Sequence, residues 1–80
     1  MTKAIQLDPD NAPAYFNRGY AYYELGQYQQ ATADSTKTIQ LDPDYAMAYN
    51  NRGIAYSNLG QDAEADADEA KACSLDSKYC

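Results

Sequence analysis

The side chains that most often carry out chemistry in proteins are sparse in this sequence. Its 80 residues contain no histidine and two cysteines, Cys73 and Cys80. Zinc sites and acid/base catalysts are usually assembled from such groups. Neither thiol has a histidine to activate it, and nearby acidic residues raise a thiol pKa rather than lower it. We therefore expect no enzyme activity, no cofactor and no metal site.

The two cysteines have two possible states, a disulfide or free thiols. They lie 7 residues apart, so in one continuous helix their backbones would be about 10 Å apart, beyond the roughly 7 Å limit for a disulfide. They can pair only if the helix ends near Leu75. We favour free thiols, with Cys73 as a small buried apolar residue and Cys80 able to join two molecules under oxidation.

A run of acidic and alanine residues from Asp62 to Ala70 allows two interpretations. It could bind a cation, or it could be the solvated face of a terminal helix. Calcium loops place their oxygens in a turn with glycine, which this run lacks. Terminal repeats need a polar outer face, and acidic residues favour helix N-termini, so we favour the solvated helix.

An internal repeat determines the architecture that positions these residues. Residues 12–45 match residues 46–79 at 18 of 34 positions. Repeats of this length are units that bury their apolar faces by stacking on one another. Thr2 to Asp10 copies Thr36 to Asp44 almost residue for residue, so residues 1–11 are predicted to be the tail of a preceding repeat. We expect one all-α domain over residues 1–80.

Apolar spacing and helix-end signals give each repeat two antiparallel helices. They are expected at Ala12–Leu25 and Tyr28–Leu41, and again at Ala46–Leu59 and Gln61–Leu75. Asn11 is suited to cap the first helix, and Gly26 and Gly60 to end the first helix of each pair.

Two glycines inside the predicted helices need a reason. Gly19 and Gly53 each cost about 0.5 to 1 kcal/mol relative to alanine in a helix. We expect close approach of the paired helix, with Ala31 facing Gly19 and Ala65 facing Gly53.

With period and motif together, the unit resembles the tetratricopeptide repeat. The matching positions are Tyr15, Arg18-Gly19, Tyr22, Leu25-Gly26, Tyr28, Ala31 and Pro43, then Tyr49, Arg52-Gly53, Tyr56, Leu59-Gly60, Ala65 and Ala72. The sequence departs from the pattern at Ser35, Thr38, Asp62, Glu69 and Ser77. The resemblance implies an α-solenoid of antiparallel helix pairs.

Arg18 and Arg52 stand where many family members carry leucine. A basic residue there could hold a ligand or form an internal ion pair. Because Asp34 and Asp68 lie at matching places on the partner helices, we favour ion pairs of Arg18 with Asp34 and of Arg52 with Asp68.

The resemblance also implies a binding surface on the concave face, lined mainly by the first helix of each repeat. Carried over by position, this surface consists of Pro13, Phe16, Asn17, Tyr20, Tyr23, Glu24, Met47, Asn50, Asn51, Ile54, Ser57 and Asn58. The other tyrosines of these helices, Tyr15, Tyr22, Tyr49 and Tyr56, are predicted to pack between helices.

These residues predict a non-catalytic protein-protein interaction module that binds a peptide or helix of a partner. One subset of the family clamps a chaperone carboxylate with cations, which the matching positions lack here. A net charge of -6 disfavours nucleic acid and anionic membranes and favours an uncharged or basic protein partner. The alternative is self-assembly, as a dimer or array, through open repeat ends. We expect a soluble protein, most simply cytoplasmic, since no signal peptide or membrane span is evident.

Overall fold

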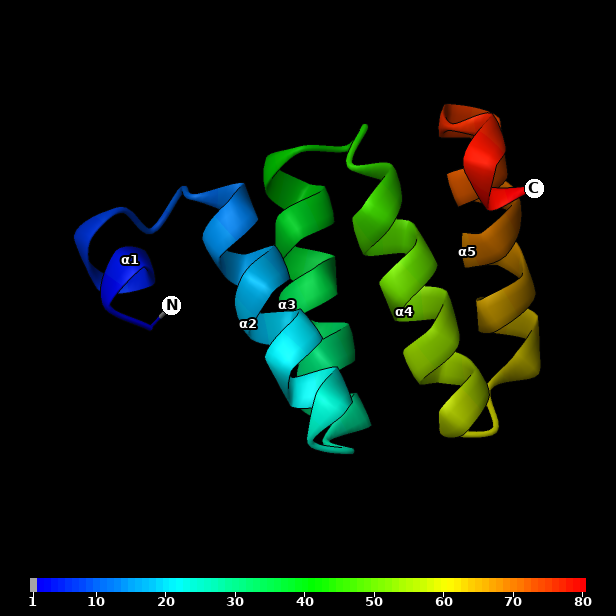
Figure 1. The fold of residues 1–80 in the computed structure, drawn as a ribbon, viewed down its shortest axis with the longest axis horizontal. Helices are drawn as coiled ribbons and strands as arrows, with labels where there is room; N and C mark the ends of the chain where they lie inside the picture. Colours follow the sequence, from blue (N-terminus) through cyan, green and yellow to red (C-terminus); the bar gives the residue numbers. More distant parts are fainter. Residues whose placement is uncertain (1) are drawn as a thin grey trace.

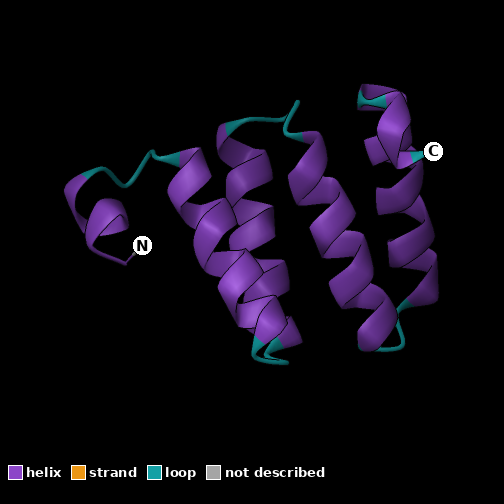
Figure 2. Cartoon of the chain, viewed as in Figure 1, coloured by secondary structure: helices purple, strands orange, loops and turns teal. Residues whose placement is uncertain are grey.

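The computed structural model describes residues 2–80 and contains five α-helices with a final 3-10 turn (Figures 1 and 2). The helices are α1 (Thr2–Leu7), α2 (Ala12–Glu24), α3 (Tyr28–Leu41), α4 (Ala46–Asn58) and α5 (Asp62–Leu75), and the turn is η1 (Ser77–Tyr79). Residues 2–80 contain no strand. The all-α prediction is therefore confirmed, and the four long helices lie within one or two residues of their expected bounds.

Each long helix packs beside the next, so α2 pairs with α3 and α4 with α5, and α3 packs on α4 (Figure 1). Short α1 lies against α2 at one end of this row. The result is a solenoid of antiparallel helix pairs measuring 34 × 25 × 17 Å. The division into repeat units at residues 12–45 and 46–79 stays a prediction.

Helix ends follow the local sequence signals. The side-chain oxygen of Asn11 accepts a 3.0 Å hydrogen bond from the Ala14 N–H, which caps α2. At the other end Gly26 has φ +77°, a left-handed conformation that suits glycine. The Gln27 N–H then donates to the Tyr22 carbonyl at 2.9 Å, satisfying a carbonyl that the helix leaves free. Gly60 ends α4 in the same way, with φ +79°.

Close helix packing explains the two internal glycines. A Cβ on Gly19 would lie 3.0 Å from the Asp34 Cβ and 3.3 Å from the Ala31 carbonyl oxygen. A Cβ on Gly53 would lie 3.2 Å from both the Asp68 Cβ and the Ala65 carbonyl oxygen. The predicted approach of the paired helix is confirmed in both pairs.

The core is built mostly from small side chains. Its buried apolar residues are Ala12, Ala14, Phe16, Ala31, Ala48, Ala55, Ala65 and Ala72. Thr38 is fully buried, and its hydroxyl donates a 2.9 Å hydrogen bond to the Asp34 carbonyl. Small residues let the helices approach closely, so polar groups between them must find partners inside the protein.

Candidate functional site

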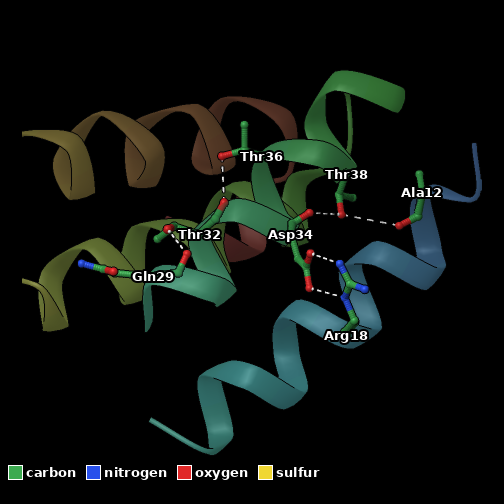
Figure 3. A network of polar contacts seen from close by, with 7 residues as sticks. All are labelled: Ala12, Arg18, Gln29, Thr32, Asp34, Thr36 and Thr38. Carbon is green, nitrogen blue, oxygen red and sulfur yellow. Dashed lines mark hydrogen bonds and ion pairs between the residues drawn. The ribbon is translucent and has the colours of Figure 1, made fainter. Parts of the chain in front are cut away.

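The two arginine-aspartate pairs hold the helix pairs together from inside. Arg18 on α2 donates through Nε and NH2 to the two carboxylate oxygens of Asp34 on α3, at 2.8 and 2.7 Å (Figure 3). Arg52 on α4 binds Asp68 on α5 in the same way, at 2.7 Å for both bonds. Side-chain exposure is 7% for Asp34 and 6% for Asp68. The predicted ion pairs are confirmed, and each is bidentate.

Tyrosine rings flank each guanidinium group. The Arg52 guanidinium carbon lies 5.6 Å from the ring centres of both Tyr49 and Tyr56. Arg18 lies 5.7 Å from Tyr15 and 5.9 Å from the ring of Tyr22. These tyrosines, expected in the core, are half-buried. They lie around the two guanidinium cations, at a distance where the cation–π attraction stabilises the charge.

Arg52 also joins neighbouring pairs. Its NH1 donates a 3.2 Å hydrogen bond to the hydroxyl of Thr36 on α3, so one side chain connects α3, α4 and α5. The hydrogen bond to Asp68 raises the pKa of Arg52 above its ordinary 12.5 despite the opposing effect of burial. The hydrogen bond to Asp34 likewise raises the pKa of Arg18. Both guanidinium groups are therefore charged throughout the physiological range.

A row of aromatic rings runs along α2 and beyond both of its ends. We call Tyr45, Phe16, Tyr20, Tyr23 and Tyr28 the aromatic ladder. Successive ring centres along it are 5.2, 6.5, 6.2 and 5.9 Å apart, within the range of favourable aromatic pairs.

The ladder is partly open to solvent. Phe16 is 8% exposed, whereas Tyr20 is 45% exposed, and Tyr23 is half-buried. Burial, followed by the nearby charge of Asp42, raises the pKa of Tyr45 above its ordinary 10.0. Phe16 is therefore a buried member of the aromatic ladder, and Tyr20 is an exposed one.

The predicted site residues of α4 are more polar. Met47 is 44% exposed, and Asn50, Asn51 and Ile54 are half-buried. The Nδ2 atom of Asn51 is buried without a hydrogen-bond partner among residues 2–80. A buried unpaired amide is uncommon in native structures.

The remaining predicted site residues lie at the surface or bond locally. Those exposed to solvent are Pro13, Asn17, Glu24, Ser57 and Asn58. Asn58 Nδ2 donates to the Ile54 carbonyl at 2.9 Å. The concave binding surface itself stays a prediction.

Two members of the ladder were not among the predicted site residues. Tyr28 begins α3 and Tyr45 precedes α4, so both lie just outside the helices that the prediction considered. In the sequence they could be recognised only as aromatic residues next to the ends of the predicted helices. Their contacts depend on how neighbouring helices turn past one another, which the sequence pattern does not give.

The expectation of free thiols is wrong. Cys73 and Cys80 form a disulfide, with Cα atoms 4.8 Å apart. Helix α5 ends at Leu75 and the chain folds back through η1, which meets the stated condition for pairing. The helix end at Leu75 was itself expected, but the sequence pattern did not show that the chain folds back through η1 far enough to bring the two cysteines together.

The acidic run is largely solvated. Asp62, Glu64, Asp66 and Glu69 are exposed, and Asp68 is paired with Arg52. Over residues 2–80 no group of three or more cysteine or acidic side chains is arranged to hold a metal ion. None of the helices in this range is long and apolar enough to cross a bilayer.

Comparison with known proteins gives the family of this chain. Matches described as "Tetratricopeptide repeat" cover residues 1–33 and 46–79, and one described as "TPR repeat" covers residues 19–60. The chain belongs to the tetratricopeptide repeat family.

This chain is similar to several known proteins, and it spans less than two thirds of the length of each one described here. The first tetratricopeptide domain of Spaghetti (RPAP3), bound to the HSP90 peptide SRMEEVD, is 32% identical with a TM-score of 0.92, over 94% of this chain and 60% of that one. The Arabidopsis OM64 domain is 40% identical with a TM-score of 0.94, over 96% and 64%. A segment of 35 residues is 46% identical to the Bos taurus protein SGT1 homolog, covering 44% of this chain and 10% of that protein.

Proposed function

We propose that this chain is a non-catalytic protein-interaction module that binds a peptide or helix of a partner on the surface formed by α2 and α4. The aromatic ladder carries the proposal. Three of its rings, Phe16, Tyr20 and Tyr23, lie on α2, and Tyr20 is 45% exposed although it has aromatic neighbours on both sides. Rigid aromatic side chains lose little entropy on binding, and they are enriched among residues that dominate interfaces.

Charge and composition favour an uncharged or basic partner. The net charge of -6 attracts cations over a distance, and the exposed face of a tyrosine ring accepts lysine or arginine at short range. The exposed amide of Asn17 can donate and accept hydrogen bonds to the backbone of an extended peptide, whereas the Nδ2 atom of Asn51 is buried.

The Spaghetti domain, which shares this fold, was solved with the peptide SRMEEVD, and this supports a peptide as the class of partner. The acidic end of that peptide suits this chain less well. The positions that would supply cations hold Pro13, Phe16, Asn17, Met47, Asn50 and Asn51. An uncharged or basic sequence complements them better.

The test is selection of binders from a random heptapeptide display library, followed by affinity measurement with variants. We expect Tyr20→Ala to weaken the selected peptide at least tenfold with little change in melting temperature, because Tyr20 is exposed. Gln30→Ala is the control, because Gln30 is also exposed but lies on α3, outside the surface formed by α2 and α4. SRMEEVD is measured in parallel and is expected to bind more weakly than the selected peptide. Equal affinity of wild type and Tyr20→Ala would refute binding at the ladder.

A second candidate is self-assembly through the open α1 end. Leu25 is 70% exposed, whereas its counterpart Leu59 is half-buried. Ala55 is fully buried, whereas its counterpart Ala21 is half-buried. The difference arises because α3 packs along α4 while α1, at 6 residues, is too short to cover α2. Sedimentation equilibrium decides between the candidates, since a dimer weakened by Leu25→Glu would support assembly.

A further inference from the structure

The turn after α5 repeats the turn that joins α3 to α4. In the α3–α4 turn the Asp42 N–H donates to the Thr38 carbonyl at 2.8 Å. The Asp42 carboxylate accepts from the Asp44 N–H at 3.2 Å, and the Tyr45 N–H donates to the Asp42 carbonyl at 3.2 Å.

The same three bonds recur 34 residues later. The Asp76 N–H donates to the Ala72 carbonyl at 2.9 Å, and the Asp76 carboxylate accepts from the Lys78 N–H at 3.1 Å. The Tyr79 N–H donates to the Asp76 carbonyl at 3.0 Å. The chain therefore takes up the conformation that, in the first copy, leads into a following helix.

Different groups hold the two turns in place. Tyr45 is the residue on which α4 begins, and its carbonyl accepts from the Ala48 N–H at 3.0 Å. In the second turn, Cys80 is bonded to Cys73 on α5. The disulfide therefore ties the end of this turn to α5.

The first turn positions the side chain of Tyr45. It holds the Tyr45 ring 5.2 Å from the ring of Phe16, 29 residues earlier, where it ends the aromatic ladder. Counting 29 residues back from Tyr79 reaches Asn50 on α4. Tyr79 is half-buried, and the Lys78 Nζ lies 5.2 Å from its ring centre. Where the first turn carries Asp44, the second therefore places a cation beside its tyrosine.

We propose that Tyr79 is a further binding residue of the surface formed by α2 and α4, and that the Cys73–Cys80 disulfide is a redox-sensitive clasp that keeps it beside Asn50. The binding part rests on the proposed function, whereas the clasp does not. Tyr79 gives the more polar α4 half of the surface an aromatic ring at the place where Tyr45 supplies one to the α2 half.

The redox step needs a dithiol reductant. A thiolate of the reductant attacks the sulfur of Cys80, which is exposed, while Cys73 is half-buried. The protein S–S bond breaks, and Cys73 leaves as a thiolate that takes up a proton. The second thiol of the reductant then displaces Cys80, which is protonated in turn, and the reductant becomes a disulfide. Two electrons and two protons pass to the protein, and the turn from Asp76 to Cys80 loses its link to α5.

The first arm of the test needs no ligand. Nuclear Overhauser contacts between the Tyr79 ring and Asn50 are measured in the oxidised protein, with the dithiol dithiothreitol, and in Cys80→Ser. We expect the contacts in the oxidised protein and their loss in the other two samples, while contacts between Tyr45 and Phe16 persist as the internal control. Contacts that are absent when oxidised, or that survive reduction, would overturn the clasp.

The second arm uses the heptapeptide selected on the oxidised protein. We expect reduction and Tyr79→Ala each to lower affinity about tenfold, the loss of one aromatic anchor. In Tyr79→Ala, affinity should no longer respond to dithiothreitol. Wild-type affinity in Tyr79→Ala would overturn the binding role of Tyr79.

Failure of the proposed function looks different, because Tyr20→Ala would then bind as wild type or no peptide would be selected. Either of those results also rejects the binding role, while the first arm still decides the clasp.

Discussion

At the scale of single residues, the arginines at a position often held by leucine are structural. Each guanidinium group binds an aspartate and lies near two tyrosine rings. The Arg52 group also donates a hydrogen bond to a hydroxyl. A buried ion pair is costly to desolvate, so its stability depends on satisfying the donors and acceptors on both partners. The bidentate geometry satisfies both oxygens of each carboxylate.

Removing one partner of such a pair should be strongly destabilising. We expect Asp68→Ala to lower the free energy of unfolding by about 3 kcal/mol, because it leaves Arg52 charged and without its carboxylate. Asp34→Ala should cost less, since Arg18 is 27% exposed against 18% for Arg52 and water can replace the partner more easily. Urea unfolding of both variants measures this. Unchanged stability in Asp34→Ala would contradict the structural role.

Tyr45 should make stability depend on alkaline pH. Its pKa is raised above 10.0 by burial and by Asp42, so the folded state favours the neutral phenol. This contribution is fully present below pH 10 and is lost as the pH rises through the folded-state pKa. We expect Tyr45→Phe to reduce this loss of stability at alkaline pH. The free energy of unfolding, measured with urea from pH 8 to 11, tests this. Tyr20→Phe, which removes the hydroxyl of a residue that is 45% exposed, is the control and should leave the pH dependence of stability unchanged.

At the scale of helices, the repeat made much of the structure predictable. A period of 34, with glycine ending the first helix of each pair, placed four helices, and the matched Arg and Asp positions led to both ion pairs. Two features were not accessible in this way. The ring of Tyr45 reaches Phe16 only through the rotation between neighbouring helices, and the disulfide depends on the turn after Leu75. Both depend on geometry between elements, whereas periodicity reports each element separately.

The glycines within α2 and α4 test the closeness of the helix pairs. Alanine would improve helix propensity by about 0.5 to 1 kcal/mol, but its Cβ at position 19 would meet the Asp34 Cβ at 3.0 Å. Overpacking of this kind costs about 1 to 3 kcal/mol. We expect Gly19→Ala to lower the free energy of unfolding by about 1 kcal/mol and Gly53→Ala to behave alike. Asn17→Ala, on the exposed side of α2, is the control for propensity alone. A stabilised Gly19→Ala would mean that the helices can separate at no cost.

At the scale of the whole molecule, the two ends of the row of helices differ. The α5 end presents exposed acidic side chains, which suits contact with water, whereas the α2 end presents exposed Leu25. Assembly through the α2 end would have to overcome repulsion between copies that each carry a net charge of -6. The net charge therefore opposes association of two copies through this end.

The opposition between the exposed apolar Leu25 and the net charge predicts how the melting temperature depends on protein concentration. If association were part of folding, the melting temperature would rise with protein concentration, because a partner that binds only the folded state stabilises it by mass action. We expect less than about 1 °C of change over a hundredfold range at physiological salt. Calorimetry with the disulfide intact makes the measurement. Raising the salt to about 1 M screens the repulsion, so a concentration dependence that appears only there, and is lost in Leu25→Glu, would show that net charge is what keeps the α2 end unpaired. A dependence already present at physiological salt would favour assembly over peptide binding.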